Sequence, residues 1–262
     1  MKKHIAFTVA LLATASVALA DADATNKVND AIGKLKAADN YAWTATIDMG
    51  PDSPFQPGPQ KGKALKDGTT WNSSEFNGNT MESFRKGTVT AMKDQDGNWQ
   101  GGGGRGGRGG FGGGGMFGGM GGGAAPVDEA ANLLKSVKDL KAGDAGLFSG
   151  DYSDEGAKNL MSFGRGGRGG GPGGPGGPGG PGGFTPPEMK NTKGDVKFWV
   201  KDGALVKYAS HTQGTMSNPD MGDFTINTTR TVEISGVGST KLDIPADAKK
   251  ILDAPPAAPT QN

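Results

Sequence analysis

The chain has 262 residues, a formal net charge of +1 and no cysteine, which excludes disulfides, thiol nucleophiles and zinc–thiolate sites. Glycine is concentrated in two blocks: it occupies 17 of the 23 positions in 101–123 and 14 of the 20 positions in 164–183. The rest of the chain has an ordinary composition, so we expect a folded domain that carries two Gly-rich inserts, not a fibrous protein.

The first twenty residues have the features of a secretory signal peptide. Lys2 and Lys3 precede a short apolar run, and Ala18-Leu19-Ala20 matches the small-x-small rule for cleavage. A membrane anchor is the alternative, but the apolar run is shorter than the roughly 20 residues that a spanning helix needs. We expect cleavage of residues 1–20 between Ala20 and Asp21, and export of the mature chain to the periplasm or the cell surface of a bacterium.

Few helices are expected in the mature chain. Apolar residues at helical spacing predict helices over residues 26–39, 127–141, 154–163 and 246–252. Pro126 stands at the start of the second helix, and Ser153 precedes two acidic residues at the start of the third.

Strands are more numerous. Apolar and polar residues alternate over residues 41–49 and 224–234, with Thr228 and Arg230 interrupting the apolar side of the second strand. Asp202-Gly203 predicts a hairpin turn between strands 196–200 and 205–212. Shorter strands are expected at 61–66, 69–76, 80–86, 88–93, 147–152 and 239–244. About ten strands joined by close turns indicate a mainly antiparallel sheet.

These elements predict a mainly β fold of the α+β type, with three or four helices covering one side of a curved antiparallel sheet or half-barrel. We expect one domain over residues 21–253, interrupted by disordered inserts at 101–123 and 164–183 and followed by a disordered tail at 254–262.

The order of the elements resembles a known family. An N-terminal helix, a run of strands and mid-chain helices precede a hairpin at 196–203, and the last strand leads into Ile244-Pro245-Ala246-Asp247-Ala248. This pattern is similar to that of the exported carriers of the LolA and LppX type. The resemblance implies a half-barrel with helices over its concave side and an apolar hollow that takes the acyl chains of lipoproteins or lipids. The missing cysteine separates this chain from the lipid-anchored members.

Apolar residues on the expected strands are the candidates for ligand binding. They either line such a hollow or fill an ordinary core, and the sequence leaves both interpretations open. The candidates are Tyr41, Trp43, Ile47, Trp71, Phe84, Phe198, Tyr208, Phe224 and Ile226.

Catalytic residues are scarce. His211 is the one histidine after the signal peptide, and its neighbour Ser210 would point to the opposite face of the same strand, so the two cannot form a nucleophile–base pair. Asp94 and Asp96 are interpreted as turn residues. We expect no enzyme activity, no metal site and no cofactor.

The two inserts share the heptad Gly-Arg-Gly-Gly-Arg-Gly-Gly, which contains Arg105, Arg108, Arg165 and Arg168. A tolerated low-complexity expansion explains it, and so does contact with an anionic envelope surface. Nucleic acid is not expected as a partner, because an exported protein rarely meets it.

The sequence therefore predicts an exported, non-enzymatic binding protein with a hydrophobic or lipidic ligand. The alternative is a structural or surface-associating envelope protein that uses the Gly/Arg-rich loops for contacts.

Overall fold

The computed structural model describes residues 15–51, 53, 56–76, 78–101, 125–161, 188–218 and 222–254, with the backbone alone for residues 15–21, 76, 188 and 218. Apart from Gly101, the two Gly-rich inserts lie outside the described residues, as does the tail beyond Ala254.

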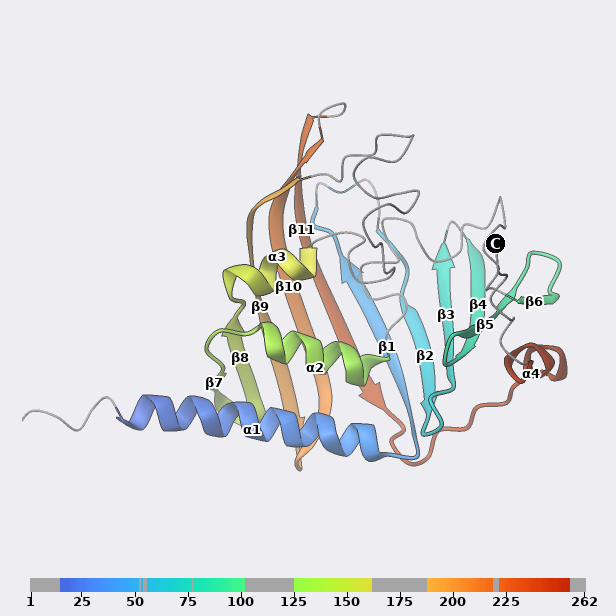
Figure 1. Ribbon diagram of the computed structural model, residues 1–262, viewed down its shortest axis with the longest axis horizontal. Helices are drawn as coiled ribbons and strands as arrows, with labels where there is room; N and C mark the ends of the chain where they lie inside the picture. The colour runs from blue at the N-terminus through green and yellow to red at the C-terminus, as the bar shows by residue number, and fades with distance from the viewer. Residues whose placement is uncertain are drawn as a thin grey trace, which may run out of the picture.

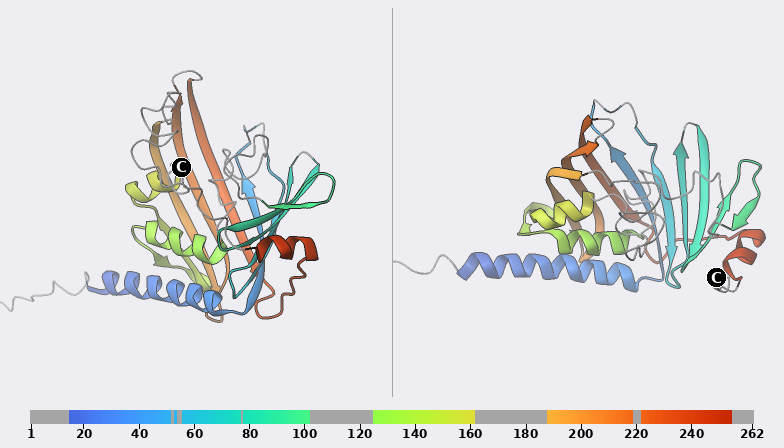
Figure 2. Two further views of the ribbon diagram at one scale, coloured as in Figure 1. Left: turned by 45° about the vertical axis from the view of Figure 1, so that its right-hand side comes forward. Right: turned by 45° about the horizontal axis from the view of Figure 1, so that its top comes forward.

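The described strands form one antiparallel sheet of eleven strands in the order β6-β5-β4-β3-β2-β1-β11-β10-β9-β8-β7. The sheet curves into an open half-barrel (Figures 1 and 2), which confirms the fold class expected from the sequence. The strands are β1 (Asn40–Asp48), β2 (Gln60–Leu65), β3 (Thr70–Phe76), β4 (Asn79–Lys86), β5 (Val89–Lys93), β6 (Trp99–Gly101), β7 (Lys141–Ala142), β8 (Leu147–Asp151), β9 (Glu188–Lys201), β10 (Ala204–Asn218) and β11 (Gly222–Ser235).

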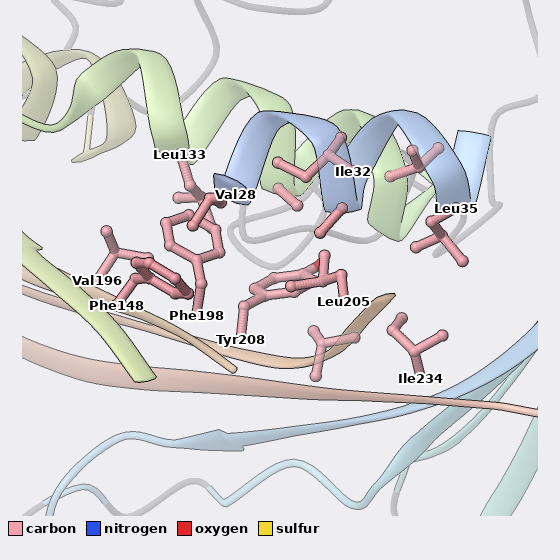
Figure 3. Packing of buried hydrophobic residues seen from close by; sticks show 14 of the residues in the cluster. Val28, Ile32, Leu35, Leu133, Phe148, Val196, Phe198, Leu205, Tyr208 and Ile234 are labelled. Carbon is pink, nitrogen blue, oxygen red and sulfur yellow. The ribbon is translucent and has the colours of Figure 1, made fainter. Parts of the chain in front are cut away.

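Three helices lie on one face of the sheet, which we call the inner face: α1 (Ala15–Ala37), α2 (Pro126–Ser136) and α3 (Asp154–Met161). Figure 3 shows the apolar core between α1, α2 and the strands, with Val28, Leu133, Phe198 and Tyr208 meeting in it. The core forms because apolar side chains alternate along β1 and β11 and therefore share one face.

The fourth helix, α4 (Ala246–Leu252), packs on the opposite, outer face. Its Ala248 and Leu252 are buried against Phe84 and Ala91. Trp71, Phe84 and Ala91 are register partners in adjacent strands and therefore share one face of the sheet. The residues next to Trp71 on β3 pair with the inward-facing residues of β2, so Trp71 and its partners face outward. The buried side of the sheet thus changes between β2 and β3, so that three helices cover the inner face and one covers the outer.

Tight turns and helix ends account for most of the boundaries. Asp202 and Gly203 both have positive φ, 53° and 72°, as the expected hairpin between β9 and β10 requires. α2 ends five residues earlier than its periodicity predicts, since Val137 takes extended geometry and forms a β-bridge with Tyr152.

The strand expected at 239–244 is absent. This segment runs along the outer face without joining the sheet, and its Leu242 and Ile244 pack against the cluster beneath α4. Within the described part of the chain, no helix is both long and apolar enough to cross a membrane.

Candidate functional site on the inner face

Seven of the nine candidate residues share the inner face. Tyr41 pairs with Ala64 and Trp43 with Ile234, and Tyr208 lies between Phe198 and Val232 in adjacent strands. The same alternation places Ile47, Phe224 and Ile226 on this side. The other two, Trp71 and Phe84, lie on the outer face near α4 and do not join them.

The part of the inner face beneath α1 and α2 is filled. Tyr41, Trp43, Phe198 and Tyr208 have exposed fractions between 0 and 5% and belong to one cluster with both helices. At this end of the half-barrel, these four side chains serve as core.

Beyond the core, the inner face carries a second group of apolar side chains, which we call the distal patch: Met161, Met189, Met216, Phe224 and Ile226. Met216 pairs with Met189 on β9 and with Phe224 on β11, and Ile226 faces Gly214. A Cβ at Gly214 would contact Met161, so the last residue of α3 already lies against the sheet here.

The distal patch is only partly covered. Met161 and Met216 are buried, Met189 and Ile226 are half-buried, and Phe224 is 41% exposed. Figure 1 shows β9, β10 and β11 extending well past α2 and α3. The signal for Met216 was its even spacing from Tyr208 along β10, and the signal for Met161 was its helical spacing from Ala157 in the expected helix at 154–163, whereas Met189 had no such pattern.

A buried polar network separates the core from the distal patch. Arg230 on β11 donates from Nε to Glu129 Oε1 of α2 over 2.8 Å and from Nη2 to Glu129 Oε2 over 3.3 Å. Tyr208 donates to Glu129 Oε2 over 2.9 Å, and Arg230 Nη1 donates to Gln60 over 3.2 Å. The break in alternation at Thr228 and Arg230 signalled this network, but its partners lie far away in sequence.

The burial of this network shifts the pKa values of Tyr208 and Arg230. Burial raises the pKa of Tyr208 well above its usual value, and the negative charge of Glu129 raises it further. Burial alone would lower the pKa of Arg230, but the charge and hydrogen bonds of Glu129 outweigh it, so the guanidinium stays charged. The network is thus a neutralised ion pair inside the half-barrel.

The two candidate catalytic residues lie apart. Ser210 is on the inner face, where its hydroxyl is 2.6 Å from the hydroxyl of Tyr152. His211 lies on the outer face, with Nδ1 3.0 Å from Asp195 and Nε2 2.9 Å from Asn227. The described residues hold no group of three His, Asp or Glu side chains placed to bind a metal ion.

Asp94 and Asp96 lie in a turn, as the sequence predicts. Asp94 accepts hydrogen bonds from the backbone N–H of Asp96 and Asn98 and from the side chain of Gln100, closing the turn between β5 and β6. The bond from Asn98 is the main cause of its lowered pKa. A carboxylate held this way is structural.

Two sets of expected residues are not tested by the described side chains. Arg105, Arg108, Arg165 and Arg168 lie outside the described residues. The expected cleavage point between Ala20 and Asp21 falls within the backbone of α1.

Comparisons with known proteins concern the fold alone. No family model and no curated protein matches the sequence. Among solved structures, the chain is similar to the lipoprotein LppX of Mycobacterium tuberculosis (TM-score 0.44, 10% identity, covering 85% of this chain and 98% of that one) and to LprF of Mycobacterium bovis (0.41, 10%, 86% and 97%). It is also similar to a DUF1329 family protein of Desulfovibrio piger (0.30, 8%, 86% and 95%). LppX is of the type that the order of sequence elements resembles.

Proposed function

We propose that this chain is an exported, non-enzymatic binding protein that holds a hydrophobic or lipidic ligand on the inner face of its half-barrel. The observation that carries the proposal is the distal patch, an apolar surface that continues past the helix-covered core and leaves Phe224 41% exposed. Export rests on the signal-like sequence of residues 1–20.

The composition of the distal patch suits a flexible apolar ligand. Three of its five members are methionines (Met161, Met189 and Met216), whose unbranched side chains adapt to irregular apolar shapes. The three come from α3, β9 and β10, so the surface that they form is shared by a helix and two strands. An acyl chain is the ligand class that such a surface accommodates without polar partners.

The site also differs from the one that the sequence suggested. Tyr41, Trp43, Phe198 and Tyr208 pack against α1 and α2, and Ile47 is buried opposite Arg230, so ligand contacts fall to Ile226 and Phe224 among the original candidates. Met161, Met189 and Met216 complete the surface.

The test is ligand uptake with a matched pair of variants. The purified protein should carry an amphiphile detectable by native mass spectrometry, or take up a fluorescent acyl probe after delipidation. Phe224→Asp places a carboxylate in the distal patch and should weaken probe binding at least tenfold. Val237→Asp is the control, because Val237 is 49% exposed and lies after β11, outside the patch.

A protein that carries no amphiphile and takes up no probe would overturn the proposal. Equal loss of binding in both variants would show that the added charge acts non-specifically, and would place the ligand away from the distal patch.

A further inference from the structure

Thr228 lies on β11 between the buried ion pair of Arg230 and Glu129 and the distal patch. It lies on the inner face of β11, two residues from Arg230 on one side and two from Ile226 on the other. Its exposed fraction is 4%, yet its hydroxyl has no hydrogen-bond partner among the residues that the structure describes. A buried hydroxyl without a partner is unfavourable and needs an explanation.

The guanidinium of Arg230, two residues away on the same face, has N–H donors without acceptors among the described residues. A guanidinium carries five N–H donors, and the described partners of Arg230 use three of them, one on Nε, one on Nη1 and one on Nη2. One N–H on each terminal nitrogen has no acceptor among the described residues. The side chain is 10% exposed, so bulk water is a poor substitute.

The acceptors nearby are already engaged. Glu129 Oε1 accepts from Arg230, and Glu129 Oε2 accepts from both Arg230 and Tyr208. The free N–H groups of Arg230 are donors only, and the Thr228 hydroxyl can donate as well as accept, so one oxygen acceptor would satisfy both residues.

Charge further narrows the class of ligand. Glu129 neutralises Arg230, so an ionised carboxylate or phosphate would introduce an uncompensated negative charge into a buried position, which is costly. A neutral carbonyl oxygen accepts the same hydrogen bonds without that penalty.

The direction of the strand gives the ligand a path. From Thr228, every second residue of β11 faces inward, through Ile226 to Phe224, over roughly 13 Å at the usual rise of a strand. An oxygen held at Thr228 would leave an attached alkyl chain lying along the distal patch.

We infer that Thr228 and the free N–H groups of Arg230 form a subsite for the carbonyl oxygen of an ester-linked acyl chain, whose alkyl part lies on the distal patch. This inference rests on the proposed function, because it requires that the inner face binds an acyl ligand.

The experiment compares three probes of equal chain length, methyl palmitate, palmitic acid and hexadecane, as competitors of a fluorescent acyl probe on the delipidated protein. The wild-type protein should prefer methyl palmitate at neutral pH. Thr228→Val keeps the shape and removes the hydroxyl, and should weaken methyl palmitate about three- to tenfold while leaving hexadecane unchanged. Thr228→Ser should restore the ester preference.

Thr229→Val is the matched control, because Thr229 is the next residue of β11 and faces outward beside His211. Infrared spectroscopy of methyl palmitate labelled with ¹³C at the carbonyl gives a second readout. The carbonyl stretch should shift to lower frequency on binding to wild type and to the control, and less so with Thr228→Val.

The outcomes separate the two proposals. If no probe binds, the proposed function fails and the subsite fails with it. If all three probes bind equally, or if Thr228→Val affects ester and alkane alike, the subsite fails and the binding function stands. Tighter binding of palmitic acid than of its ester would overturn the assignment to a neutral carbonyl.

Discussion

The indole of Trp43 lies directly over Gly62, the residue opposite it on β2. The two are register partners, and a Cβ at position 62 would overlap the Cζ2 and Cε2 atoms of the ring. Trp43 can therefore reach sideways across β2 while its own exposed fraction stays at 5%. The largest side chain in this part of the core fits because its neighbour has none.

Gly62→Ala should destabilise the fold. The added methyl must displace a buried ring, and overpacking of this kind costs about 1–3 kcal/mol. Gly33→Ala is the control, because Gly33 is exposed on α1 and a Cβ added there would have no atom within 4 Å; this change should gain about 0.5–1 kcal/mol in helix propensity. Urea unfolding measures both. A Gly62→Ala protein as stable as wild type would contradict this account of Trp43.

Much of the fold follows from local patterns. Alternation in β1 and β11, and the Asp202-Gly203 turn, depend on neighbouring residues, so the sequence alone was enough to predict them. Which side of the sheet is buried could not be predicted in this way, because it depends on a helix that is distant in the sequence. Trp71 and Phe84 were grouped with the inner candidates because nothing local shows that α4, far along the chain, covers them on the outer face.

The candidate site was predictable to a lesser degree. The polar interruption at Thr228 and Arg230 is visible in the sequence, but Glu129 is 101 residues from Arg230, and no local pattern connects them. The filling of the hollow near Tyr41 and Tyr208 also depends on where α1 and α2 pack. Long-range placement thus decided which apolar residues became core and which formed the distal patch.

Breaking the ion pair between Glu129 and Arg230 should be costly. Its side chains are 13% and 10% exposed, respectively, so Glu129→Leu alone leaves a buried cation and should cost about 3–5 kcal/mol. Glu129→Leu combined with Arg230→Met should cost much less than the sum of the single changes. A double-mutant cycle by urea unfolding measures the coupling.

The control cycle uses Asp247 and Lys250 on α4, whose side chains are 73% and 79% exposed. Their coupling should be close to zero. Equal coupling in the two cycles would mean that burial adds nothing to the inner pair.

The three tyrosines of the chain should make the protein sensitive to alkali. Tyr41, Tyr152 and Tyr208 are all buried. Burial raises the pKa of Tyr41 to about 12 and raises the pKa of Tyr152 and of Tyr208 well above the usual 10.0. The unfolded chain therefore loses these protons first, so stability is complete below pH 10 and falls as the pH rises towards the folded pKa values.

Tyrosinate absorbance and circular dichroism, followed together against pH, measure this effect. Ionisation should accompany loss of structure, whereas the urea-unfolded protein should titrate near its usual pKa. Tyr41→Phe should reduce the alkaline loss of stability. Tyrosinate formation near pH 10 in a protein with intact structure would be the contrary result.

Cleavage after Ala20 should leave the fold intact. Among the described side chains of α1, Ala24 is the first that is buried, followed by Val28, so a chain that begins at Asp21 keeps all the buried side chains described for this helix. Expressed in full in a bacterium, the protein should be recovered outside the cytoplasm with Asp21 as its first residue, as mass spectrometry would show. A further truncation that begins at Asp30 removes Ala24 and Val28 and should lower the melting temperature; recovery of an uncleaved chain would contradict the signal peptide.

The arginines of the inserts are expected to act through charge alone. Replacing Arg105, Arg108, Arg165 and Arg168 with Gln removes four positive charges at sequence positions outside the β-rich domain, so the melting temperature should not change. If these arginines contact an anionic surface, binding to vesicles with anionic lipids should fall, and the wild-type binding should weaken with added salt. The control removes the same charge from exposed positions of the domain by replacing Lys193, Lys197, Lys201 and Lys249 with Gln. Equal loss of binding in both variants would show that net charge, and not the shared heptad, attracts the surface. Unchanged binding in the arginine variant would leave the inserts as a tolerated expansion.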